Sequence, residues 1–80
     1  NALSEKIKIY PNPFTNYLQI EGAEVQKYQI LRMDSSLIIS TNNDSHSDKL
    51  LISIKDLNAG NYVLQLRIKN EWKSYQILKE

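Results

Sequence analysis

The sequence has no cysteine, and it has only two glycines, two prolines and one histidine. Without cysteine there is no disulfide, no thiolate nucleophile and no thiolate metal ligand, so stability has to come from packing. Gly22 and Gly60 lie far apart in the sequence, which excludes a glycine-rich phosphate-binding loop. No serine has a histidine and a carboxylate on a recognisable catalytic scaffold. These absences indicate that the chain is not an enzyme.

An excess of charge of one sign and long apolar runs are also missing. Ten Lys and Arg residues against nine Asp and Glu residues leave a net charge of +1. That charge is too small to attract nucleic acid or an anionic membrane. No apolar run approaches the roughly 20 residues of a membrane helix, and the N-terminus lacks the basic and apolar regions of a signal peptide. The small net charge therefore predicts no nucleic acid partner.

The 80 residues, 41% hydrophobic and 24% charged, have the composition of one small globular domain. A chain of this length buries only about 60 to 65% of its unfolded surface, so its core has to be thin. The sequence starts with Asn1 and Ala2 and no methionine, as a fragment of a longer protein would behind a cloning remnant. We expect residues 1–5 to be a linker or cloning remnant and residues 6–80 to be the domain.

Short alternating runs of β-branched and aromatic residues, separated by Pro, Gly, Asn, Asp and Ser, predict an all-β fold. The spacing is typical of an immunoglobulin-like antiparallel β-sandwich of about seven strands. We expect strands at residues 7–10, 17–21, 26–33, 37–41, 49–54, 61–68 and 72–79. The side chains expected to be mostly buried are Ile9, Leu18, Ile20, Ile30, Leu64, Leu66, Tyr75 and Ile77.

The last two expected strands also predict a hairpin register. A two-residue loop at Asn70-Glu71 pairs Leu66 with Tyr75, Leu64 with Ile77 and Ile68 with Lys73. A slip of one residue would turn Gln76 or Ser74 toward the core, where each unpaired polar group costs on the order of 1 to 3 kcal/mol. We therefore expect the first register.

Two groups of residues could form a ligand site. His46, between Asp44 and Asp48 in the polar segment 41–48, could bind a metal, but an exposed and solvated loop is the simpler interpretation. Tyr10, Tyr17 and Trp72 could line a sugar-binding surface, but aromatic residues are also favoured in strands for packing alone. We expect neither a metal nor a cofactor.

Two further segments have a restricted backbone conformation. Each proline of Pro11-Asn12-Pro13 fixes its own φ and biases the residue before it toward an extended conformation. We expect a stiff connection between the first two strands, which could also be an exposed epitope that is ordered before a partner binds. Tyr62 follows a glycine-containing corner, Leu57 to Gly60, at the start of an alternating strand. That spacing predicts a tyrosine corner, in which the hydroxyl bonds a backbone group a few residues upstream.

Together, YPNPFTNYLQI near the start, LNAGNYVLQL near residue 60 and the ending QILKE resemble the type A C-terminal sorting domain of type IX (Por) secretion. The resemblance runs from about Ile7 to Glu80. Pro11, Asn12 and Pro13 match the proline motif of the family, and Lys79 matches its terminal lysine. Leu57, Gly60 and Tyr62 match its glycine-tyrosine motif, and these three residues are expected to have a structural role. The resemblance implies recognition through Pro11, Asn12, Pro13, Lys79 and Glu80.

The resemblance implies a secretion signal that directs a larger N-terminal cargo domain of the same chain across the outer membrane of Bacteroidetes-type bacteria. The implied partners are the outer-membrane translocon, a shuttle protein and a cysteine sortase that cleaves the domain during surface attachment. The implied location is the periplasm in transit, then the outer membrane and cell surface or the medium. The alternative is an extracellular carbohydrate-binding or spacer β-sandwich, which predicts one exposed aromatic cluster.

Two details of the matching segments carry their own expectations. Asp34-Ser35-Ser36 occupies a turn where the family usually has glycine, and a type I turn, which needs no positive φ, would accommodate the sequence. Leu78 is expected on the outer face of the last strand, where it contributes little to the core. We therefore expect residues 78–80 to be available to a partner and separable from the stability of the fold.

Overall fold

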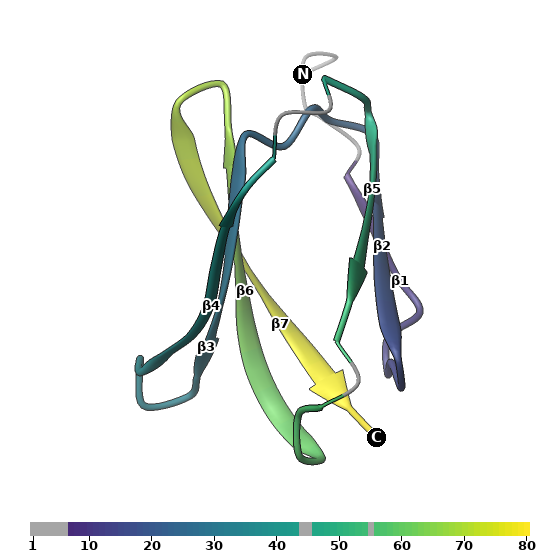
Figure 1. Cartoon of the computed structure of the whole chain (residues 1–80), viewed down its shortest axis with the longest axis vertical. Coiled ribbons are helices and arrows are strands. Elements are labelled where there is room, and N and C mark those ends of the chain that lie inside the picture. The colour runs from purple at the N-terminus through teal and green to yellow at the C-terminus, as the bar shows by residue number, and fades with distance from the viewer. Residues whose placement is uncertain (1–6, 44–45, 55) are drawn as a thin grey trace.

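The computed structural model describes residues 7–43, 46–54 and 56–80 and confirms the all-β sandwich. Its two antiparallel sheets have the strand orders β1-β2-β5 and β4-β3-β6-β7, and they pack face to face (Figure 1). Each strand begins and ends within one residue of its expected bounds. The strands are β1 (Lys8–Tyr10), β2 (Tyr17–Glu21), β3 (Lys27–Arg32), β4 (Leu37–Asn42), β5 (Lys49–Ser53), β6 (Gly60–Ile68) and β7 (Glu71–Lys79).

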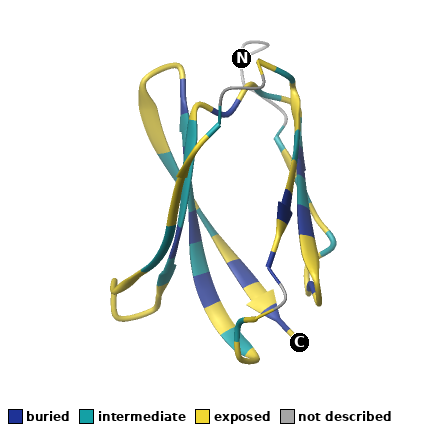
Figure 2. Cartoon of the chain, in the orientation of Figure 1, coloured by how far each residue is buried: buried dark blue, intermediate teal, exposed yellow. Residues whose placement is uncertain are grey.

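The core lies between the sheets because successive side chains of a strand point to opposite faces. Along β6, Tyr62, Leu64, Leu66 and Ile68 are buried, while the residues between them are half-buried (Figure 2). Six of the eight side chains expected in the core are buried, namely Leu18, Ile20, Ile30, Leu64, Leu66 and Ile77. The core also contains six residues outside that list, namely Phe14, Val25, Ile52, Ile54, Tyr62 and Ile68.

The other two expected core residues, Ile9 and Tyr75, are only half-buried. Both lie on edge strands: β1 is at the edge of the three-stranded sheet, and β7 is at the edge of the four-stranded sheet. A side chain on an edge strand has a covering neighbour on one side only. The alternation therefore predicted the correct face for these residues but overestimated their burial.

The expected register of the β6–β7 hairpin is wrong by two residues. The loop is Lys69-Asn70 rather than Asn70-Glu71, and both loop residues have positive φ, 52° and 64°. This is the pattern of a type I′ turn, in which asparagine tolerates the second central position far better than glutamate would. The shift is an even number, so the inward face is unchanged. The observed inward pairs are Tyr62 with Ile77, Leu64 with Tyr75 and Leu66 with Lys73.

The β3–β4 turn agrees only in part with its expected form. Ser35 has φ 73°, so a positive φ, which favours glycine, does occur in this segment. Met33 and Asp34, the central residues of the turn, have no positive φ, as in the expected type I turn, and Ser35 follows them. The Ser35 N–H donates to the Arg32 carbonyl at 2.9 Å. The Asp34 Oδ1 accepts from the Ser36 hydroxyl at 2.6 Å and from the Ser36 N–H at 2.9 Å, and these bonds lower the pKa of the Asp34 carboxyl.

Candidate functional site

The proline motif crosses from β1 to β2 at one end of the sandwich. The Tyr10-Pro11 and Asn12-Pro13 peptide bonds are both cis. Asn12 and Pro13 are exposed, Pro11 is half-buried, and Phe14 directly after them is fully buried. The segment is therefore held by an apolar anchor at Phe14 and presents Asn12 and Pro13 to solvent.

Backbone and side-chain hydrogen bonds join this crossing to the end of β7. The Phe14 N–H donates to the Leu78 carbonyl at 2.9 Å, and the Glu80 N–H donates to the Phe14 carbonyl at 2.9 Å. The Leu78 N–H donates to the Asn12 side-chain oxygen at 3.1 Å. Phe14 forms a parallel β-bridge with Lys79, so the crossing acts as a one-residue neighbour strand for β7.

The glycine-tyrosine motif reaches the same end of the sheet from the other side of β7. Gly60 pairs with Lys79, and Tyr62 pairs with Ile77. Gly60 has φ 150°, and no atom lies within 4 Å of where a Cβ would be, so the backbone conformation rather than space favours glycine. The Tyr62 hydroxyl donates to the Asn58 carbonyl at 2.6 Å, which confirms the tyrosine corner. Leu57 packs against the core.

Three segments that are far apart in the sequence therefore meet at one place. We call this place the C-terminal junction, after the end of β7, and it is visible at the lower end of Figure 1. Its exposed residues surround a shallow hollow lined by Asn12, Pro13, Asn61, Gln76, Ile77 and Leu78. Asn61, Gln76 and Phe14 were not expected at a functional site. The one sign of this buried residue in the sequence is that Phe14, which is apolar, directly follows Pro-Asn-Pro.

The last three residues contribute unequally to the junction. Leu78 is 37% exposed, as expected for the outer face, but Lys79 is only 8% exposed and its Nζ donates to the Glu80 carbonyl at 3.0 Å. The backbone of these residues holds the proline motif, so removing residues 78–80 would also remove hydrogen bonds of the fold. A deletion of residues 78–80 therefore changes the exposed ending and the hydrogen bonds of the fold together, whereas substitutions at the accessible Leu78 and Glu80 side chains keep those bonds.

The possible metal site is not supported by the geometry of the described residues. The His46 Nδ1 lies 2.9 Å from the Glu24 Oε1, and both side chains are well exposed. Asp44 lies outside the described residues. Across residues 7–43, 46–54 and 56–80, no group of three or more His, Cys, Asp or Glu side chains could hold a metal ion. The same residues contain no helix long and apolar enough to cross a membrane.

The aromatic cluster that the carbohydrate-binding alternative predicts is divided between the two sheets. Tyr10 and Tyr17 lie on the β1-β2-β5 sheet, whereas Trp72 lies on β7 of the other sheet. The Tyr10 hydroxyl donates to the Glu21 carboxylate, and this bond raises the pKa of Tyr10. The three aromatic residues therefore cannot bind one sugar chain together.

Comparison with known proteins gives one family. A family model described as the secretion system C-terminal sorting domain matches residues 8–80. The match covers every strand of both sheets and all the residues of the C-terminal junction. Among curated proteins, none matches the chain significantly.

Proposed function

The chain belongs to the family of C-terminal sorting domains of type IX secretion, and we propose that the C-terminal junction is the surface by which the secretion machinery recognises it. A domain of this family is a non-catalytic sorting signal that sends its attached cargo through the outer membrane to the surface or the medium. The proposal concerns which residues carry that signal.

The observation that carries the proposal is the convergence of the proline motif, the glycine-tyrosine motif and the end of β7. Asn12 and Leu78 are 66 residues apart in the sequence and are hydrogen-bonded. Gly60 and Lys79, from the other two segments, are paired neighbours. Packing alone needs a buried anchor such as Phe14, but it does not need exposed residues from all three segments to line one hollow.

The exposed part of the junction suits an uncharged recognition chemistry. Pro13 and Leu78 offer apolar surface, and Asn12, Asn61 and Gln76 offer amide donors and acceptors around it. The hydrogen bonds from Phe14 and Glu80 fix the backbone beneath these side chains before a partner arrives. Such preorganisation lowers the entropy that binding has to overcome.

Further features of the proposal follow from the family resemblance. We propose that the domain is of type A, because the proline motif, the glycine-tyrosine motif and Lys79, on which that resemblance rests, are all present. The translocon and the shuttle protein recognise the domain in the periplasm, and a cysteine sortase then cleaves it from the cargo during surface attachment. Support for these partners comes from the family match and the accessible junction.

The experiment fuses a reporter with a signal peptide to this domain and expresses the fusion in a bacterium that has type IX secretion. Leu78→Gln changes an exposed junction side chain and keeps every backbone hydrogen bond. Its matched control is Leu51→Gln, because Leu51 is 62% exposed on the outer face of the other sheet. We expect the Leu78 variant to accumulate in the periplasm and the Leu51 variant to reach the surface or medium.

Urea melts of the isolated domains show whether both variants fold as stably as the parent. Equal export of the two folded variants would contradict the junction as the recognition surface. Retention of the unmodified fusion in the periplasm would contradict the sorting function of this chain itself.

A further inference from the structure

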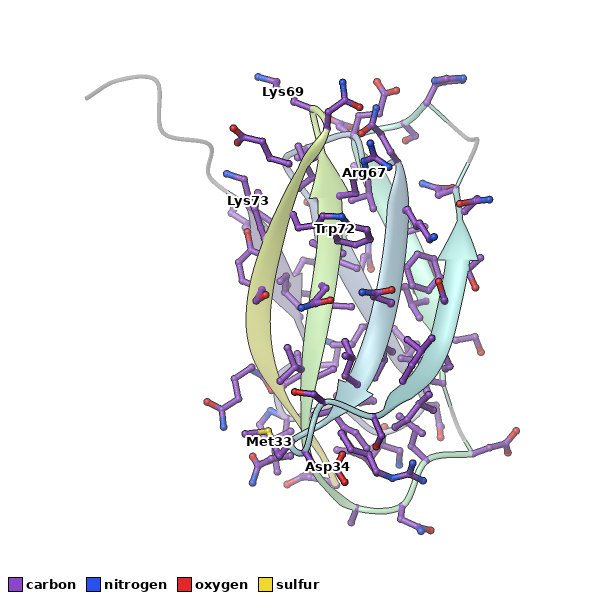
Figure 3. The ribbon with its side chains drawn as sticks, turned by 90° about the vertical axis from the view of Figure 1, so that its left-hand side faces the viewer. Met33, Asp34, Arg67, Lys69, Trp72 and Lys73 are labelled. Atoms are coloured by element: carbon purple, nitrogen blue, oxygen red, sulfur yellow. The ribbon has the colours of Figure 1, made fainter. Side chains whose placement is uncertain are left out.

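The outer face of the four-stranded sheet has a row of four side chains that lies outside the C-terminal junction. The register places Asn42 of β4, Lys27 of β3, Arg67 of β6 and Trp72 of β7 side by side. Figure 3 views this face and shows Arg67 and Trp72 close together on neighbouring strands, at the end away from Met33 and Asp34. The row lies at the opposite end of the sheet from the C-terminal junction.

Lys27 and Arg67 are adjacent cations on paired strands, an arrangement that is unfavourable unless negative charge is supplied. Within the part of the chain that the structure describes, no carboxylate forms an ion pair with either of them. The Arg67 Nε is buried and has no hydrogen-bond partner among these residues. A buried donor without a partner is costly, and it adds to the strain of the two adjacent cations. An oxyanion bound beside Lys27 and Arg67 would offset the repulsion between them.

Beside the two cations lies a hollow of about 220 Å³ that is lined by polar and charged residues. It is formed by Gln26, Lys27, Asn42, Arg67 and Asn70. A guanidinium holds a carboxylate or phosphate through paired N–H donors, and the three amides can bond hydroxyl groups. The concave shape and small size suit one small ligand group better than a flat protein surface.

Backbone hydrogen bonds hold the wall of the hollow in place. The Gln26 N–H donates to the Arg67 carbonyl at 2.8 Å, and the Gln26 carbonyl accepts from the Asn43 N–H at 2.9 Å. The Gln26 side-chain oxygen accepts from the Asn70 N–H at 3.0 Å, which leaves its amide nitrogen as a donor. The hollow is therefore formed before a ligand binds.

Trp72 and the next row of side chains add surface beside the cations that suits a sugar ring. Trp72 is 45% exposed next to Arg67 and offers an apolar ring face on which the C–H groups of a sugar can pack. In the next row, the Gln29 amide donates to Gln65, and the Gln65 amide donates to the Ser74 hydroxyl. These rows contain amides, hydroxyls and cations but no carboxylate.

We propose that Lys27, Arg67 and Trp72 form a binding site for an acidic sugar, which is a sugar ring that carries a carboxylate or a phosphate. The two cations and the polar hollow hold the oxyanion, and Trp72 packs against the ring. Neutral sugars lack the negative charge that offsets Lys27 and Arg67, and inorganic phosphate lacks the ring. Binding at this site is independent of the sorting function and of the C-terminal junction.

Trp72 is the only tryptophan, so its fluorescence reports directly on the site. The isolated domain is titrated at low ionic strength with glucuronate, glucose 1-phosphate, glucose and inorganic phosphate. We expect saturable changes with one or both acidic sugars, weakened by added salt. The affinity should be at least about tenfold lower for glucose, which lacks the charged hydrogen bonds, and for inorganic phosphate, which lacks the ring that packs on Trp72.

Arg67→Gln should weaken acidic-sugar binding about tenfold or more, because it removes the charged hydrogen bonds. Arg32→Gln makes the same change in charge at the other end of β3 and should leave binding unchanged. Trp72→Ala, followed by amide chemical shifts, should weaken acidic sugars but not inorganic phosphate. The proposal is overturned if neither acidic sugar binds, if inorganic phosphate binds as tightly, or if the two arginine variants lose binding equally.

Discussion

Asn12 and Leu78 are joined by a hydrogen bond of 3.1 Å from the Leu78 N–H to the Asn12 side-chain oxygen, across 66 residues of sequence. This bond fixes the proline crossing against the last strand. Asn12→Ala should lower the free energy of unfolding by about 0.5 to 1.5 kcal/mol, because the acceptor is lost. Asn12→Asp keeps an acceptor and should have a urea midpoint close to that of the parent. Equal midpoints for the Ala and Asp variants would show that the bond contributes nothing.

The tyrosine corner makes a second prediction. Tyr62→Phe removes only the hydroxyl that bonds the Asn58 carbonyl, and it should destabilise the domain by roughly 1 to 2 kcal/mol without changing the fold. Tyr17→Phe removes a hydroxyl from a side chain that is 44% exposed, and its urea midpoint should not move. An unchanged midpoint for the Tyr62 variant would contradict the role of the corner in joining the sheets.

The β3–β4 turn offers a stabilising substitution. Ser35 has φ 73°, a conformation that costs an L side chain on the order of 1 to 2 kcal/mol and that glycine adopts readily. Glycine also has more freedom in the unfolded chain, so Ser35→Gly should stabilise the domain by a net amount of about 0.5 to 1 kcal/mol. The same change at Ser53, the last residue of β5, should destabilise it. A lower urea midpoint for the Ser35 variant would refute the strain at this position.

The thin core predicts a sharp contrast between buried and exposed leucines. Leu64 is fully buried, so Leu64→Ala should cost about 2 to 5 kcal/mol, which is comparable to the whole stability of a small domain. Leu51 is 62% exposed, so Leu51→Ala should change the free energy of unfolding by no more than about 0.5 kcal/mol. Denaturant titrations that give similar losses for both would mean that the inner face of β6 is not the core.

The sequence by itself determined the strands and their inner faces, because alternation along a strand is local. Leu64 and Leu66 are buried and Gln65 between them is not, as the pattern alone predicts. The tyrosine corner was also predictable, since Tyr62 and its partner Asn58 are only four residues apart. The resemblance to the sorting family rested on short motifs that are visible without any coordinates.

Only the tertiary structure decided the hairpin register, the burial of Phe14 and the meeting of the motifs. A two-residue shift of β7 keeps the same side chains inward, so the hydrophobic pattern could not detect it. The structure shows the turn at Lys69-Asn70, where both residues have positive φ. Phe14 is buried because its backbone bonds Leu78 and Glu80, residues at the other end of the chain. Lys27, Arg67 and Trp72 became neighbours in the same way, since contacts between distant segments depend on strand order and register, which no local pattern encodes.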